Sequence, residues 1–138
     1  AARGRNFFLC EQEIVLQVHP DDTPAQRQAL LNSFYRKQLD AQIRARLPYW
    51  EEKTGLHPES VQIKNMKTRW GTCNTAARRI WLNLQLAKQP PVCLDYVLAH
   101  ELTHLRHPDH GKGFWAFLLR VMPDCKAVRK ALGENRFQ

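Results

Sequence analysis

The alternation of hydrophobic and polar residues divides the first part of the chain into a strand-like stretch and a long helix. Asn6 to His19 alternate loosely, which is typical of one or two short strands. Leucine, isoleucine and aromatic residues then recur at about every fourth position, so that they share one face of a helix. We expect this amphipathic helix to begin with Asp22 or Thr23 as its N-cap and to run for about six to seven turns. Pro48 should kink or interrupt it, and Gly55 should end whatever continues.

The second half of the chain predicts three short strands followed by three helices. Val61 to Met66 alternates like a strand, and Lys67 to Ala87 is typical of two strands around a polar turn. Helices are expected from Val92 to Arg106, from Gly111 to Met122 and, more briefly, from Asp124 to Leu132. The pattern indicates an α+β domain in which a small antiparallel sheet packs against the long helix and the later ones.

The motif H-E-x-x-H lies in the predicted Val92 to Arg106 helix, at His100, Glu101 and His104. Four residues turn an α-helix by about 400°, so both imidazoles emerge on one face, about 6 Å apart along the axis. One metal ion can bridge them, and Glu101 can lean toward a water at that ion. This is the pattern of zinc hydrolases, and it predicts a Zn²⁺ site.

A catalytic zinc ion takes three protein ligands and keeps one position open, so a third ligand is needed. His110 lies beyond Pro108, where the chain should turn, and it can fold back to complete the site. We therefore favour His110. His107 continues the helical stripe, from which three residues do not easily converge on one tetrahedral ion. His107 and an acid such as Asp124 stay as the alternatives.

A site of this kind predicts hydrolysis by a zinc-activated water. Zinc lowers the pKa of its bound water to about 7, which makes hydroxide available at neutral pH. Glu101 is expected to act as the general base that accepts the proton of this water and later passes it to the leaving group. Arg69, Asn83 and His107 are candidates for binding the substrate and stabilising the developing oxyanion.

The chain has a formal net charge of +8, and the excess of cations is uneven. Between Ser60 and Lys88 the sequence contains Lys and Arg but no Asp or Glu. Such a block can attract phosphate-bearing partners, including weakly bound nucleic acid. A solvated basic surface is the simpler interpretation of the same pattern.

Cysteine spacing and hydropathy bear on where the protein resides. The four cysteines are far apart and form no C-x-x-C pair, which excludes a zinc ribbon and favours reduced thiols in a cytoplasmic compartment. No apolar run approaches the ~18 residues that a membrane helix needs, so no membrane association is expected.

Four stretches of the sequence resemble the YgjP-like metallopeptidase family, whose members are similar to the WLM and SprT-like minimal zinc metallopeptidases. The stretches are MKTRWGTC (Met66 to Cys73), IWLNLQL (Ile80 to Leu86), LDYVLAHELTHLRHPDHGKGFW (Leu94 to Trp115) and MPD (Met122 to Asp124). The resemblance extends from about Arg27 to the carboxyl end. It implies a zincin-like fold with Zn²⁺ on His100, His104 and His110, and with Glu101 as the general base.

The resemblance also bears on domain organisation. Members of the family usually carry a further β-rich segment at the amino end, and this chain does not begin with Met. We therefore expect a fragment or a processed form, in which residues 1–22 are the remnant of that segment and residues 23–138 form the catalytic domain.

Three functions compete at this point. The leading hypothesis is a zinc-dependent metallopeptidase, in which an extended peptide adds along a strand edge at Ile80 to Leu86. The alternative keeps the metal but takes a nucleoside triphosphate as substrate, bound by the basic block from Ser60 to Lys88. The third hypothesis is a nucleic-acid-associated protease or binding module. A purely structural zinc is disfavoured, because such sites are usually closed by four protein ligands.

Overall fold

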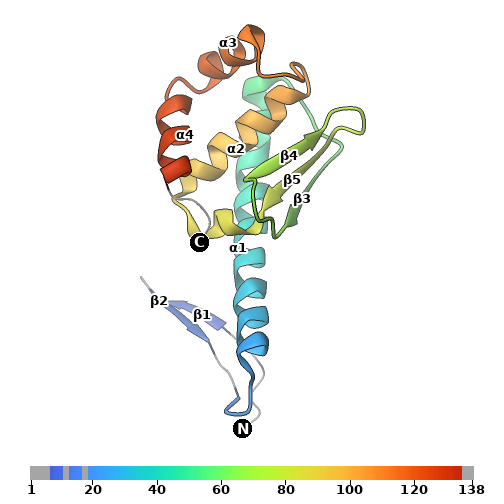
Figure 1. The fold of residues 1–138 in the computed structure, drawn as a ribbon. Coiled ribbons are helices and arrows are strands. Elements are labelled where there is room, and N and C mark those ends of the chain that lie inside the picture. Colours follow the sequence, from blue (N-terminus) through green and yellow to red (C-terminus); the bar gives the residue numbers. More distant parts are fainter. Residues whose placement is uncertain (1–6, 11–12, 17–18, 135–138) are drawn as a thin grey trace.

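A computed structural model of the chain describes residues 7–10, 13–16 and 19–134 (Figure 1). It consists of helices and a small sheet, so the predicted α+β fold is confirmed. Of the predicted strand region Asn6 to His19, two strands are present, and residues 6, 11–12 and 17–18 lie outside the described part. In chain order the elements are β1 (Phe7–Cys10), β2 (Glu13–Leu16), α1 (Pro24–Thr54), β3 (Ser60–Lys64), β4 (Gly71–Asn74), β5 (Arg79–Asn83), the 3-10 helix η1 (Leu84–Lys88), α2 (Pro91–His104), α3 (Lys112–Val121) and α4 (Cys125–Glu134).

The long helix α1 begins and ends as the sequence predicts, but it is not interrupted. Thr23 is its N-cap and forms a reciprocal capping box with Gln26, while Gly55 ends it in the left-handed conformation at φ 73°. Pro48 lies inside the helix, which is unbroken over its whole length of 31 residues, so the expected interruption is wrong. Proline removes one backbone hydrogen bond. The turn beyond it is held by tertiary contacts, because the indole of Trp50 is buried in the core.

Helix α2 lies across the carboxyl-terminal half of α1, and a shared carboxylate joins the two (Figure 1). Asp95 Oδ1 on α2 accepts a hydrogen bond from Trp50 Nε1 and another from Arg46 Nε, both at 2.8 Å. The bond from Arg46 is charge-assisted, which is the stronger class of hydrogen bond. This polar contact adds to the apolar packing between α1 and α2.

The three-stranded sheet is mixed, with the strand order β3-β5-β4. The predicted antiparallel pairing is present between β4 and β5, whereas β3 pairs with β5 in parallel. The expectation of an edge strand over Ile80 to Leu86 is wrong for two reasons. The strand β5 is central, so both of its edges are already paired, and it ends at Asn83, where η1 begins. The free edge nearest to α2 belongs to β4.

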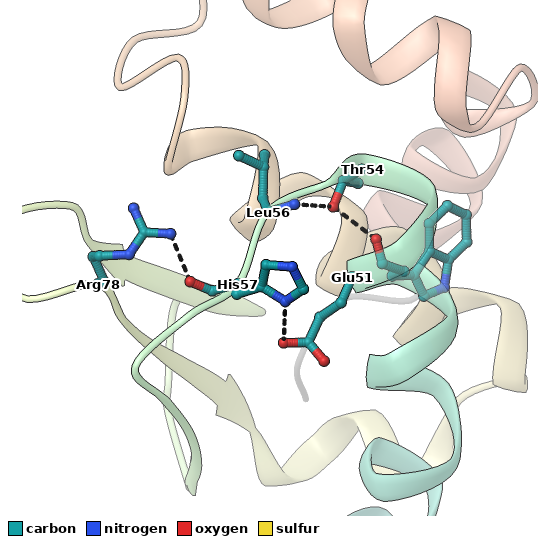
Figure 2. A network of polar contacts seen from close by, with 6 residues as sticks. Glu51, Thr54, Leu56, His57 and Arg78 are labelled. Carbon is teal, nitrogen blue, oxygen red and sulfur yellow. Dashed lines mark hydrogen bonds and ion pairs between the residues drawn. The ribbon is translucent and has the colours of Figure 1, made fainter.

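Polar contacts hold the connection between α1 and β3 against the sheet (Figure 2). Thr54 Oγ1 accepts a hydrogen bond from the backbone N–H of Leu56, and His57 Nδ1 lies 3.1 Å from Glu51 Oε2. Arg78, in the turn between β4 and β5, donates from Nη2 to the backbone oxygen of His57 at 2.6 Å. The turn of the hairpin is thereby tied to the end of α1.

Helix α2 is the centre of the core. It contacts α1, β4, β5, η1, α3 and α4. Most of the side chains of α2 are buried, among them Leu94, Val97, Leu98, Ala99 and Leu102.

In the described part of the chain, no helix combines the length and hydrophobicity needed to cross a membrane.

We expect Asp95→Ala to lower the free energy of unfolding by about 2 kcal/mol, because it removes the shared acceptor of Arg46 and Trp50. Urea denaturation followed by circular dichroism measures this change. The matched control is Asp40→Ala, which removes an exposed ion pair with Arg44 on α1 and should cost no more than about 0.5 kcal/mol. Equal losses in the two variants would contradict the anchoring role of Asp95.

Candidate metal centre

Two histidines project from the last turns of α2 into one site. His100 and His104 are separated by one helical turn, and their ring centroids lie 5.0 Å apart. His104 is buried and His100 is half-buried. The predicted placement of both rings on one helical face is therefore confirmed.

His110 reaches the same site from the segment between α2 and α3. Its Nε2 lies 3.1 Å from Nε2 of His104, and its ring centroid is 5.2 Å from that of His100. One ligand atom from each of the three histidines lies within 4.8 Å of the other two. Nitrogens bound to one tetrahedral zinc ion at about 2.0 Å are about 3.3 Å apart, so the three side chains can hold such an ion with little movement.

A backbone carbonyl orients the imidazole of His104. Nδ1 of His104 lies 3.1 Å from the backbone oxygen of His107, to which it can only donate, and Nε2 is directed toward His110 as the ring nitrogen open to a metal ion. Partners of this kind hold the ring and the tautomer of a metal-binding histidine. The sequence did not predict that the backbone carbonyl of His107 has this role. The one sequence feature that points to it is Pro108, which turns the chain there.

The ring of His107 lies elsewhere. It packs 5.7 Å from the ring of Phe117, against the start of α3, where a Cβ added at Gly113 would approach its Nδ1 to 3.0 Å. Within the described residues, the cluster that can hold a metal comprises His100, His104 and His110 and includes neither His107 nor Asp124. The two alternative third ligands are therefore not brought to the site.

An aromatic side chain forms the apolar wall of the centre. The ring of Phe114, on α3, is fully buried and lies 4.7 to 4.9 Å from the rings of all three histidines. His110 is exposed overall, but partial desolvation of its ring lowers its pKa, and the neighbouring His104 and His100 lower it further. His110 is thus neutral at pH 7, which is the state that binds a metal ion.

Glu101 lies between α2 and β4 beside the histidine cluster. Its side chain is buried, and Oε2 lies 3.3 Å from Nδ1 of His100. The approach of β4 requires a glycine, because a Cβ at Gly71 would lie 2.8 Å from Val97 Cγ1 and 3.1 Å from Glu101 Oε2. Burial and, after it, the negative charge of Glu101 raise the pKa of Cys73 on β4 to about 11. Cys73 is therefore a neutral thiol at pH 7.

A cleft of about 810 Å³ opens beside His100 and Glu101. One wall is the segment from Lys67 to Gly71, which contains the predicted substrate-binding residue Arg69. Helix α4 forms the opposite wall. Tyr96 also lines the cleft, and burial is the main cause that raises its pKa to about 12, so its hydroxyl stays protonated and can donate a hydrogen bond.

Asn83, the other predicted substrate-binding residue, is not exposed to the cleft. It is fully buried, and its amide Nδ2 donates to the backbone oxygens of Met66 and Arg69 at 3.1 and 2.7 Å. Its Oδ1 accepts from the backbone N–H groups of Met66 and Gln85. With every polar atom of the amide engaged, Asn83 holds the segment that carries Arg69 rather than a substrate.

The chain is similar to known metallopeptidases in sequence and in fold. The family model described as "YgjP-like, metallopeptidase domain" matches residues 3–135. The crystal structure of the metallopeptidase zymogen abylysin of Pyrococcus abyssi is similar, with a TM-score of 0.59 and 21% identity over 64% of this chain and 90% of that one. The crystal structure of the metallopeptidase zymogen jannalysin of Methanocaldococcus jannaschii is also similar, with a TM-score of 0.61 and 18% identity over 70% of this chain and 91% of that one. At these identities the likeness shows a shared fold. Comparison with the curated proteins gives no significant match.

Loss of an outer hydrogen-bond partner weakens metal binding about 10–100-fold. His110→Ala should weaken the binding of a divalent metal ion by more than this, because only two imidazole ligands remain. Competition with a chromophoric chelator measures the affinity. His107→Ala is the matched control and should bind nearly as tightly as the wild type, since it keeps the backbone carbonyl that orients His104. A similar loss in both variants would contradict the assignment of the third ligand.

Proposed function

The chain belongs to the YgjP-like family of metallopeptidase domains, and from this premise we propose that it is a zinc-dependent peptidase with Glu101 as its general base. The observation that carries the proposal is the convergence of three imidazole ligand atoms within 4.8 Å of one another, next to a buried carboxylate at the edge of a cleft.

The donor set favours Zn²⁺ over harder ions. Three imidazole ligands and one open position form the arrangement that catalytic zinc sites use, whereas Mg²⁺ and Ca²⁺ prefer oxygen ligands. We assign the ligands to His100, His104 and His110. When bound, Zn²⁺ supplies a Lewis acid that lowers the pKa of water and polarises the carbonyl of the scissile peptide bond.

We assign proton transfer to Glu101. Its carboxylate accepts the proton of the attacking water and then passes it to the nitrogen of the leaving amine. The contact of Oε2 with Nδ1 of His100, and the packing of Gly71 against the carboxylate, hold Glu101 in one position. A carboxylate with little freedom of movement loses little entropy when it reaches the transition state.

The substrate is an extended peptide that pairs with the free edge of β4. Main-chain hydrogen bonds to an exposed strand edge are a common way of binding peptides. This replaces the edge predicted at Ile80 to Leu86, since β5 is central in the sheet. Arg69 and the hydroxyl of Tyr96 line the cleft beside Glu101. We assign to them the donation of hydrogen bonds to the oxyanion that forms at the scissile carbonyl.

Glu101→Gln should lower kcat on the order of a thousandfold, because glutamine keeps the size of the side chain but cannot accept the proton. The assay incubates zinc-loaded protein with an unfolded protein and counts new amino termini by mass spectrometry. The zinc content of the variant is measured in parallel and should equal that of the wild type. New termini that persist undiminished in the variant would count against Glu101. If the wild type produces no new termini, the proposed peptidase is overturned.

Gly71→Ala should reduce turnover strongly and cost about 1–3 kcal/mol of stability, because the added methyl group overlaps Val97 and displaces Glu101. Zinc content should be retained, since no ligand is touched. The stability control is Gly133→Ala, where a Cβ meets no atom within 4 Å and the helical position favours alanine. Full turnover in Gly71→Ala would contradict the tight contact between β4 and Glu101.

A further inference from the structure

We propose that the cleft contains a carboxylate-binding subsite on α4, through which the enzyme prefers peptides with an acidic group close to the scissile bond. The inference rests on the proposed peptidase function and names the substrate class of the same site. Its observations are the charge of the cleft walls, the aromatic side chain that holds two of the cations, and their nearness to the histidine cluster.

Both walls of the cleft are basic. Two cations belong to the segment before β4 and three to α4, and all five side chains are exposed. Glu101 is the one acidic residue that lines the cleft within the described part of the chain. None of the five cations forms an ion pair with a carboxylate whose position the structure describes. The five are Lys67, Arg69, Lys126, Arg129 and Lys130.

An indole ring holds two of these cations in place. Arg129 Cζ lies 5.3 Å and Lys126 Nζ 5.8 Å from the ring centroid of Trp115 on α3. Cations over an aromatic face are attracted by its negative charge density, so these two side chains are restrained without an acidic partner among the described side chains. The charge stays available to a ligand, and less entropy is lost when the ligand binds.

Trp115 also brings the cations close to the reaction centre. Its ring centroid lies 6.5 Å from the rings of His100 and His110. Together these contacts place the guanidinium of Arg129 within about 12 Å of the His100 ring, which an extended peptide spans in three to four residues at about 3.3 Å each. The subsite therefore receives an acidic group within about three residues of the scissile bond.

The shared chemistry of the ligand is a carboxylate. The guanidinium of Arg129 can bind both oxygens of a carboxylate at once, and the nearby ammonium groups add charge without demanding a fixed geometry. Two sources supply this group in a peptide, namely an Asp or Glu side chain and the chain-terminal carboxylate. An amidated carboxyl end distinguishes them.

The test uses a set of unstructured peptides of one sequence, each with a single Glu placed from four residues before to four residues after the cleaved bond, and matched Gln peptides. Each is made with a free and with an amidated carboxyl end. With zinc-loaded wild type, we expect Glu at one or more positions within three residues of the bond to raise kcat/KM about tenfold over Gln. The preference should shrink as salt is added, because salt screens exposed charges.

Variants assign the preference to α4. In Arg129→Gln combined with Lys126→Gln, the ratio of kcat/KM for Glu and Gln peptides should fall close to one. The matched control is Arg120→Gln, since Arg120 also lies on an aromatic ring, 5.2 Å from Phe117, but does not line the cleft. Arg120→Gln should keep the full ratio. The same peptides, carrying a fluorescent label, are bound to the Glu101→Gln variant, which should not cleave them. Fluorescence anisotropy should then give a lower Kd for Glu peptides than for Gln peptides.

Three other outcomes would overturn the subsite. Cleavage of Glu and Gln peptides at equal rates would remove it and leave the peptidase in place. A preference that persists in the α4 variant would place the acidic group elsewhere. A preference for a free carboxyl end alone would support the carboxylate-binding subsite and identify the chain-terminal carboxylate as its ligand. Cleavage of no peptide, with hydrolysis of ATP added in the same tube, would overturn the subsite and the proposed peptidase together.

Discussion

The packing of α2 among six other elements is the constraint on which the rest of the structure depends. A helix satisfies its own backbone hydrogen bonds, so it can lie at the centre of a domain, but each polar side chain on it then needs a partner. Asp95 meets Trp50 and Arg46 of α1, and Thr103 donates to the backbone of Ala99. Among the described residues no buried side-chain nitrogen or oxygen lacks a hydrogen-bond partner. The polar groups that point to the cleft are those of the candidate site.

The segment that follows α2 completes this arrangement. The carbonyl of His107 holds the ring of His104 at one side, and Phe114 packs against all three histidines at the other. Both contacts restrain the histidines in an arrangement that can hold a metal ion, and such restraint reduces the cost of binding one. The same helix, α3, presents Phe114 to the metal centre and Trp115 to the cations of α4. One short helix therefore links the metal site to the charge of the cleft.

The helical period of α4 explains why the face that borders the cleft is basic. Cys125, Val128 and Leu132 are buried, while Lys126 and Arg129 lie between them and are exposed. This amphipathic pattern is visible in the sequence and would have predicted one basic face on the helix. It did not indicate that this face lies opposite the segment around Arg69. Of the cations in the basic block from Ser60 to Lys88, only Lys67 and Arg69 line the cleft, so the positive charges of the block do not form one surface there.

The sequence by itself determined the features that depend on geometry within a few residues. The i,i+4 spacing of His100 and His104, the cap at Thr23 and the end of α1 at Gly55 follow from the helical period and from the conformations that single residues favour. Strand order, the burial of Asn83 and the joining of α4 to the cleft were decided only by the tertiary structure. These features arise from contacts between segments far apart in the chain, and the alternation of residues along one strand is the same whether that strand is central or at an edge.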